Sequence, residues 1–312
     1  MSGPRRRTAQ VDAPVDAQAY ALCLMATAAW GLNAVAGKFA VGHISPFTIT
    51  AARWGLVALA GLPFAWPHLR RDGPVIRQHA ALLFAYGAVG FAGFNLALYT
   101  ALNHTAAINV VIEQAGVPGV IFALNLVFFR QRVAGFQLVG FALTVLGVAL
   151  MISDGQPARL LALDINAGDG LMLVAILCYG GFTAALAFKP AIHWLSFITV
   201  LATAAFITAL PFALWEYAAG PWISPDWQGI GVAVFAALIP GLAAQSLFIR
   251  ANELIGGNRA GVFFNLVPVF GTLFAIVLLG EVLHGFHFVA LVLVLGGIAL
   301  AEARLIPKRQ RP

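Results

Sequence analysis

The sequence has few charged residues. Only 10% of its 312 residues are Asp, Glu, Lys or Arg, whereas soluble domains average about 25%. So few charges cannot cover a surface that faces water, which excludes an ordinary soluble domain. Cysteine is scarce as well. Cys23 and Cys178 both lie inside apolar segments, which argues against a disulfide framework.

Sequence motifs of catalysis and energy coupling are also missing. There is no G-x-x-x-x-G-K-[ST] sequence, so the chain contains no ATP-driven motor of that type. There is no H-E-x-x-H motif, no clustered set of Cys and His, and no G-x-S-x-G elbow. We therefore expect no catalytic residues, no metal and no cofactor, and we interpret the chain as a protein that is not an enzyme.

Apolar residues are abundant, at 61% of the chain, and the mean hydropathy is +0.89. A membrane-spanning helix needs roughly 20 predominantly apolar residues, and ten segments of about that length follow one another along the sequence. Lipid offers no partner to open backbone groups, so the spans should be helices. We predict an all-α polytopic membrane protein with ten transmembrane helices. The expected spans lie near residues 19–41, 46–66, 79–101, 105–128, 133–152, 169–188, 195–215, 228–249, 258–280 and 284–303.

The net charge of +6 reflects membrane topology and needs no nucleic acid as partner. If the N-terminus is cytoplasmic, nearly every Lys and Arg between the spans falls on the cytoplasmic side, and Arg159 is the exception. The positive-inside rule then predicts two cytoplasmic termini, in a bacterial inner (plasma) membrane. Tryptophans near the expected span ends suggest an aromatic belt. They are Trp54, Trp66, Trp194, Trp215, Trp222 and Trp227.

The chain contains an internal repeat. A shift of 150 positions aligns Pro118 with Pro268 and Gly135-Phe136 with Gly285-Phe286, without a gap. Five helices per copy is an odd number, so the second copy inserts upside down. Inverted repeats underlie alternating access in many secondary transporters. The expected parts are a disordered cytoplasmic tail (1–18), a first five-helix repeat (19–152), an outer linker (153–168), a second five-helix repeat (169–303) and a basic cytoplasmic tail (304–312).

The first helices resemble the opening of the EamA repeat of the drug/metabolite transporter (DMT) superfamily. The residues that carry this resemblance are Trp30-Gly31-Leu32-Asn33, Lys38, Ser45-Pro46-Phe47 and Arg53. The end of the second copy resembles the same repeat through Pro268, Leu279-Gly280-Glu281, Gly285 and Gly296-Gly297. One departure is Arg130-Gln131-Arg132, where the family usually carries a Gly-Glu pair.

The resemblance implies a ten-helix carrier in the lipid bilayer that exports small metabolites or drugs. In general appearance the chain is similar to the bacterial aromatic amino-acid exporters of the YddG type. The prediction is a secondary transporter that exports aromatic or large neutral amino acids by alternating access, as a monomer or a homodimer. Alternatives with the same fold are export of drugs, purines or other metabolites. A membrane enzyme or a scaffold without transport is a more remote reading.

Polar and aromatic residues inside the spans are the candidates for a substrate cavity. Rings would suit an aromatic side chain, and amides would suit an ammonium and a carboxylate group. The alternative is that these residues form ordinary hydrogen bonds between helices. The candidates are Trp30, Asn33, Asn95, Tyr99, Tyr179, Thr183, Gln245 and Asn265.

Charged residues and prolines inside the spans complete the list of candidates. Glu113, the one acid that we place well inside a span, could couple transport to protons or could be a buried structural acid. Lys38 and Arg53 could pair with a substrate carboxylate, although snorkelling to the outer surface or pairing with a loop acid is the expected role. Pro118 and Pro268 each remove a helix hydrogen bond, so they are either hinges or static kinks.

Overall fold

The computed structural model describes residues 13–128, 135–156, 158, 166–255, 260 and 262–302. Several expectations concern residues outside these ranges. They include Arg130, Arg132 and Arg159, most of the linker, the C-terminal tail and the first twelve residues of the N-terminal tail.

The described residues form helices and short connections, without a strand, and the predicted all-α class is confirmed. Eight runs are long and apolar enough to cross a membrane, and two shorter apolar helices complete the ten. In chain order the spans are α1 (Ala13–Ala40), α2 (Pro46–Gln78), α3 (Ala80–Ala85) with η1 (Tyr86–Gly93) and α4 (Phe94–Ala101), α5 (Ala107–Gln114) with α6 (Val117–Phe128), α7 (Gly135–Ile152), α9 (Ala167–Ala185) with η2 (Leu186–Phe188), α10 (Trp194–Ala219), α11 (Trp227–Ala236) with η3 (Ala237–Ala243) and α12 (Ala244–Ile255), η4 (Val262–Leu266) with α14 (Val267–Leu279), and α15 (Gly285–Glu302).

Helices α1 and α2 extend beyond the spans that hydropathy predicts. Helix α2 runs to Gln78, twelve residues past the expected end, and it contains Pro63, Pro67 and Pro74. Helix α1 begins at Ala13, within the residues expected to form a tail. Hydropathy marks where lipid ends, whereas a helix ends where its backbone hydrogen bonds end, so the two limits need not coincide.

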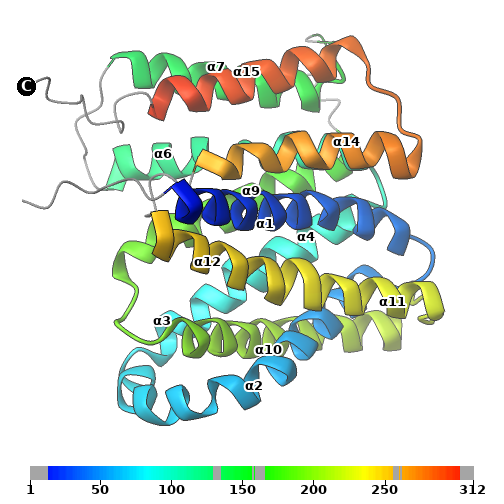
Figure 1. The fold of residues 1–312 in the computed structure, drawn as a ribbon. Helices are drawn as coiled ribbons and strands as arrows, with labels where there is room; N and C mark the ends of the chain where they lie inside the picture. Colours follow the sequence, from blue (N-terminus) through cyan, green and yellow to red (C-terminus); the bar gives the residue numbers. More distant parts are fainter. Residues whose placement is uncertain are drawn as a thin grey trace, which may run out of the picture.

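The two repeats interlock, because equivalent helices of each repeat pack on helices of the other. Helix α1 packs on α12 and α14 of the second repeat, and α9, its counterpart, packs on α4 and α6 of the first. Helix α2 packs along α10, and α7 packs along α15. Figure 1 shows these last two pairs on opposite flanks of the bundle. The inverted five-helix architecture predicted from the repeat is therefore confirmed.

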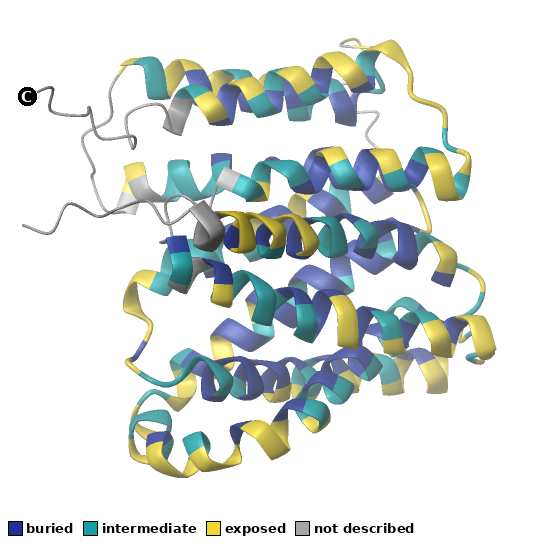
Figure 2. Ribbon diagram, viewed as in Figure 1, coloured by how far each residue is buried: buried dark blue, intermediate teal, exposed yellow. Residues whose placement is uncertain are grey.

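The outward faces of the bundle are apolar, as Figure 2 shows by the exposed positions along its flanks. Leu59, Phe64 and Val277 are 69%, 71% and 67% exposed. Soluble proteins rarely expose contiguous apolar surface on this scale. Lipid therefore takes the place of water around these helices, which explains why so few charges suffice.

The helical backbone is interrupted at matching places in the two repeats. The π-helical stretches η1 and η3 contain Gly90 and Pro240, which are 150 positions apart. Between α5 and α6 the chain turns at Ala115-Gly116, just before Pro118, and a 3₁₀ turn (η4) precedes Pro268. π-Bulges often occur at functional sites, and these interruptions surround the region where the repeats meet.

The two ends of the bundle differ in what they carry. We call the end at which α1 begins and α15 ends the proximal end and the opposite one the distal end (Figure 1). The distal end contains the turns that join α1 to α2, α4 to α5, α10 to α11 and α14 to α15. The expected topology makes the distal end the outer one.

Candidate substrate site between the two repeats

Arg53 connects three helices inside the first repeat. Its side chain is 6% exposed in the second turn of α2. Its Nη1 donates to Asn33 Oδ1 of α1 at 2.6 Å and to the Tyr99 hydroxyl of α4 at 2.7 Å. The Tyr99 hydroxyl in turn donates to Asn33 Oδ1 at 3.2 Å. Two of the predicted cavity residues, Asn33 and Tyr99, therefore meet at a buried guanidinium.

The expectation that Arg53 snorkels to the outer surface is wrong. The guanidinium points into the bundle, and no carboxylate of the described residues forms an ion pair with it. Both hydrogen bonds use Nη1, whereas the buried Nε has no partner. A signal was available in the sequence, because Arg53 lies seven residues beyond Pro46, or roughly 10 Å along the helix at 1.5 Å per residue. That depth makes it difficult for the side chain to reach the surface.

Asn95 lies one turn from Tyr99 on the same face of α4. It is 2% exposed, and its Nδ2 donates to the carbonyl of Phe91 in η1 at 2.8 Å. Its Oδ1 is buried without a hydrogen-bond partner. Buried polar atoms are nearly always bonded in native proteins, so this acceptor is free for a group that the protein itself does not supply.

Aromatic rings lie beside the guanidinium. Trp54 stacks on Phe91 with ring centroids 4.4 Å apart and an interplanar angle of 16°, and Arg53 Cζ lies 5.1 Å from the Trp54 ring centroid. Trp54 is 5% exposed, and its indole Nε1 has no hydrogen-bond partner. The assignment of Trp54 to an aromatic belt is therefore wrong, because the ring packs inside the bundle and does not reach the membrane interface.

Trp30 forms a second aromatic cluster, together with residues of the second repeat. Its ring stacks on Phe264 at 4.8 Å and lies 5.3 Å from Phe248. Its indole Nε1 donates to the carbonyl of Pro240 in η3 at 3.1 Å. A π-helical stretch changes the helical hydrogen-bond pattern, and here the side chain of the opposite repeat satisfies one of its carbonyls.

The other predicted cavity residues are less closely tied to Arg53. Tyr179 contacts Phe94 with centroids 5.1 Å apart, while Thr183 donates back to the carbonyl of Tyr179 at 2.7 Å, as an ordinary helix residue does. Gln245 in α12 and Asn265 in η4 are half-buried. Within the described residues, no hydrogen bond joins either of them to the Arg53 cluster.

Glu113 is fully buried in α5, and neither carboxylate oxygen has a hydrogen-bond partner among the described residues. Two further acids are buried near helix ends. Asp169 lies in the first turn of α9 and Glu216 near the end of α10, and they are 1% and 4% exposed.

Carboxylates of the second repeat cap helices of the first at the distal end. Glu216 accepts from the backbone N–H groups of Phe47 and Thr48 at 3.3 and 2.9 Å. Glu281 accepts from those of Ala107 and Ile108, both at 2.8 Å. A carboxylate at a helix N-terminus satisfies free N–H groups and the positive end of the helix dipole. Each bond pair therefore ties one repeat to the other.

Other polar contacts join the distal turns. Lys38 donates to the carbonyls of Leu102 and Thr105, each at 2.8 Å, so this lysine satisfies carbonyl groups at the end of α4 and in the turn that follows it. His43 Nδ1 donates to Asp226 Oδ2 at 2.7 Å, and this hydrogen bond lowers the pKa of the Asp226 carboxyl. The distal end is thus closed by contacts that involve both repeats.

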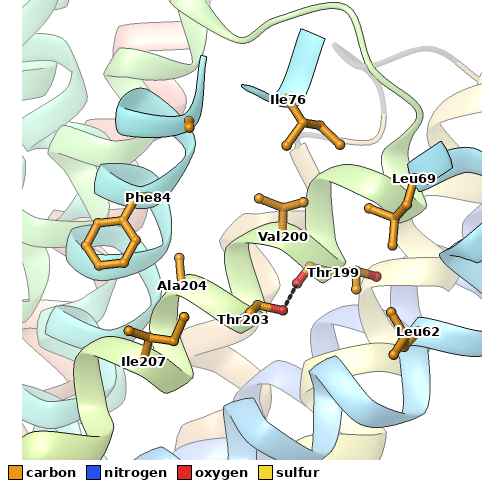
Figure 3. A pocket seen from close by; sticks show the side chains of 10 residues that line it. Leu62, Leu69, Ile76, Phe84, Thr199, Val200, Thr203, Ala204 and Ile207 are labelled. Atoms are coloured by element: carbon orange, nitrogen blue, oxygen red, sulfur yellow. Dashed lines mark hydrogen bonds between the residues drawn. The ribbon is translucent and has the colours of Figure 1, made fainter. Parts of the chain in front are cut away.

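A groove on the flank of the bundle is a poor candidate for the site. It lies between α2, α3 and α10 and is lined by Leu62, Leu69, Ile76, Phe84, Val200 and Ile207, among others (Figure 3). Thr203, which also faces it, donates to the carbonyl of Thr199 in its own helix at 2.8 Å. Nearly all of this surface is apolar, which suits a lipid chain.

The part of the chain that the structure describes contains neither a metal site nor a disulfide. No group of three or more His, Cys, Asp or Glu side chains is arranged to hold a metal ion there. Cys23 and Cys178 are free.

Comparison with known proteins gives one family. The model of the EamA-like transporter family matches residues 17–153 and 166–302. Uncharacterized transporter YyaM of Bacillus subtilis is 24% identical over 87% of this chain and 89% of its own. A protein of Salmonella typhimurium named "Probable amino-acid metabolite efflux pump" is 26% identical over 89% and 92%. A solved crystal structure shares the fold, with a TM-score of 0.63 and 19% identity over 95% of this chain and 99% of that one.

Proposed function

Because the chain belongs to the EamA-like transporter family, we propose that it exports aromatic or large neutral amino acids by alternating access. It is a multi-pass membrane transporter, and its cargo is a small molecule. The observation that carries the amino-acid proposal is the cluster of Arg53, Asn33, Tyr99 and Asn95 beside the stacked rings of Trp54 and Phe91. Such a lining offers polar groups to a head group and ring surface to a side chain.

The relatives favour the same cargo. The Salmonella protein is named as an amino-acid metabolite efflux pump, and it matches this chain over nearly its whole length. Its name supports export in preference to uptake for the present chain. The distribution of Lys and Arg between the spans supports a bacterial inner membrane with both termini in the cytoplasm.

The distal contacts support a closed outer gate. Glu216 and Glu281 tie the repeats together at that end, whereas Trp30, Gln245 and Asn265 are half-buried. In an inverted repeat the alternative state arises when the two copies exchange conformations. The matched interruptions at Pro118 and Pro268 are our proposed hinges for that exchange, because a helix that lacks a hydrogen bond bends at little cost.

Glu113 is our proposed proton-coupling residue. An ionised carboxylate without a partner is expensive to bury, and the Glu113 oxygens have none among the described residues. Opening the distal end would expose this carboxyl to water and change that cost. A proton bound in one conformation and released in the other would then couple transport to the pH gradient.

Flux of labelled phenylalanine into liposomes carrying the purified protein tests the proposal, with and without a pH gradient and against empty liposomes. We expect saturable flux that unlabelled tryptophan and tyrosine reduce, with the cargo recovered chemically unchanged. Absence of flux by folded protein would contradict amino-acid export and favour drugs, purines or other metabolites. Recovery of an altered product would contradict transport and indicate an enzyme.

A further inference from the structure

The Arg53 guanidinium has unused binding capacity in a place where proteins rarely leave any. Buried charges are normally paired, yet Arg53 is 6% exposed and no described carboxylate pairs with it. A guanidinium has five N–H donors. The protein's acceptors, Asn33 Oδ1 and the Tyr99 hydroxyl, both bind Nη1, which leaves Nε unpartnered. A planar carboxylate accepts two parallel hydrogen bonds from such a fork.

Two more buried atoms have no hydrogen-bond partner among the described residues, one on Trp54, which follows Arg53, and one on Asn95, one turn from Tyr99, the partner of Arg53. The indole Nε1 of Trp54, the following residue, is a buried donor without an acceptor. Asn95 Oδ1, one turn from Tyr99 on α4, is a buried acceptor without a donor. The rise of four helical residues is about 6 Å. Asn95 and Tyr99, whose hydroxyl binds the guanidinium, are therefore separated along α4 by no more than the length of one small molecule.

We propose that Arg53 is the receptor for the carboxylate of the cargo and that Asn95 Oδ1 accepts a hydrogen bond from its α-ammonium group. This proposal rests on the proposed amino-acid transport and gives its head-group chemistry. The Trp54 and Phe91 rings, stacked at 4.4 Å, form the adjoining apolar wall. Asn33 and Tyr99 hold the guanidinium in place from α1 and α4. In this closed arrangement the unpartnered atoms mark the positions that the cargo occupies.

The arrangement also explains how a cation can remain buried without a carboxylate beside it. Asn33 and Tyr99 solvate one edge of the guanidinium, and the Trp54 ring lies 5.1 Å from Cζ, where a cation–π attraction acts. These contacts lower the cost of burial without supplying a negative charge. The charge is therefore free to be neutralised by the cargo. Cargo without an anionic group gains nothing from Arg53.

Displacement of labelled phenylalanine from the purified full chain tests this by comparing cargo analogues. The competitors are phenylalanine, phenethylamine, which lacks the carboxylate, and 3-phenylpropionate, which lacks the ammonium. A hydrogen bond to a charged group contributes about 1.5–3 kcal/mol. On the native chain we expect phenethylamine to bind roughly 10- to 100-fold more weakly than phenylalanine.

Substitution of Arg53 should remove that discrimination. In Arg53→Gln we expect the affinity for phenylalanine to fall by the same factor of roughly 10 to 100, while the affinity for phenethylamine changes by less than about 3-fold. Arg53→Lys keeps the charge but loses the planar fork of donors. It should therefore restore only part of the preference for phenylalanine over phenethylamine. Asn95→Leu should weaken phenylalanine and phenethylamine and leave 3-phenylpropionate unchanged.

Arg70→Gln is the matched control, because Arg70 lies on the same helix with its Cζ 4.9 Å from the exposed ring of Trp66. Its affinities for the three competitors should equal those of the native chain. Equal losses for all three competitors in Arg53→Gln, at an unchanged elution profile, would mean that Arg53 is structural and would overturn the proposal.

Failure of the proposed amino-acid cargo can be told apart from failure of the Arg53 proposal. If the native chain binds no phenylalanine, its unfolding temperature is measured with a panel of other carboxylates, phosphates and organic cations. Stabilisation by an anionic compound that Arg53→Gln abolishes would reject the amino-acid cargo and support the anion receptor. Stabilisation by cations alone would reject both the amino-acid cargo and the role of Arg53 as an anion receptor.

Discussion

Glu281 caps the first turn of α5 at Ala107, although 174 residues separate the two. Gly280 makes this possible. It adopts a left-handed conformation with φ of 69°, ends α14 and turns the chain so that the next side chain reaches the other repeat. The carboxylate accepts a second hydrogen bond from Ile108 N–H at 2.8 Å. A contact of this kind forms only while the distal ends of α14 and α5 are adjacent, so it links helix capping to the conformation of the carrier.

Removal of this cap should favour the open distal end. Loss of a helix N-cap costs about 0.5–2 kcal/mol, which corresponds to roughly a 2- to 30-fold shift in population. We expect Glu281→Ala to increase labelling of a cysteine introduced at Thr105, in a chain freed of Cys23 and Cys178, by a membrane-impermeant maleimide. Asp226→Asn, which removes an exposed contact at the same end, should change labelling much less. Equal labelling of native chain and Glu281→Ala would contradict the gate.

Proton coupling is tested by replacing Glu113 with glutamine, which keeps the shape and removes the titrating group. We expect Glu113→Gln to exchange phenylalanine across liposomes but to lose the effect of a pH gradient. Glu216→Gln is the control, because the Glu216 carboxylate already accepts hydrogen bonds from Phe47 and Thr48. A gradient effect that survives in Glu113→Gln would leave this residue with a structural role.

The hinge proposal separates turnover from binding. Pro268→Ala adds a backbone N–H at the start of α14 and allows the helix to continue toward η4, so bending should become harder. We expect the flux rate to fall by more than the affinity for phenylalanine. Pro63→Ala, within the regular and exposed part of α2, should alter neither. Rate and affinity that change by the same factor would indicate a static kink.

The contact between α1 and α14 is tight enough to test by adding one methyl group. A Cβ at Gly31 would lie 2.7 Å from the backbone nitrogen of Gly271 and 2.9 Å from the carbonyl oxygen of Val267. Backbone atoms cannot move aside as a side chain does, so we expect Gly31→Ala to destabilise the protein by about 1–3 kcal/mol. Gly181→Ala has open space around it and should stabilise α9 by up to about 1 kcal/mol. Unfolding temperatures in detergent measure both, and an unchanged value for Gly31→Ala would mean that the two helices separate freely.

The pair of Asp226 and His43 should contribute to stability in a pH-dependent way. The hydrogen bond from His43 lowers the pKa of Asp226 in the folded state. The stabilisation is therefore present above the unfolded pKa, about 3.9, and disappears as the pH falls through the folded pKa. We expect the native chain to have a higher unfolding temperature than Asp226→Asn near neutral pH, and the difference to shrink below about pH 3.9 and to vanish once Asp226 is protonated in the folded chain as well. A difference that persists there would mean that the amide substitution acts by another route.

The sequence was sufficient for the membrane class, the number of spans and the repeat. Scarcity of charge and ten long apolar segments leave few alternatives, since lipid demands closed backbone hydrogen bonding. The 150-residue register also located the interruptions, because Pro118 and Pro268 stand at the start of α6 and α14, directly after the break in each span. Trp30, Asn33, Asn95 and Tyr99 were identified as interior residues for the simple reason that polar groups in a span must find partners.

Tertiary structure alone decided which of these groups meet. Arg53 was expected at the surface, and it became the centre of the candidate site because α1 and α4 bring Asn33 and Tyr99 to it. Glu216 and Glu281 cap helices of the opposite repeat, although the sequence marked Glu281 only as part of a family motif and predicted no role for Glu216. Local composition determines what each helix is, since lipid acts on every segment separately. Contacts between residues more than 150 positions apart depend on how the helices pack, and no local pattern in the sequence encodes that.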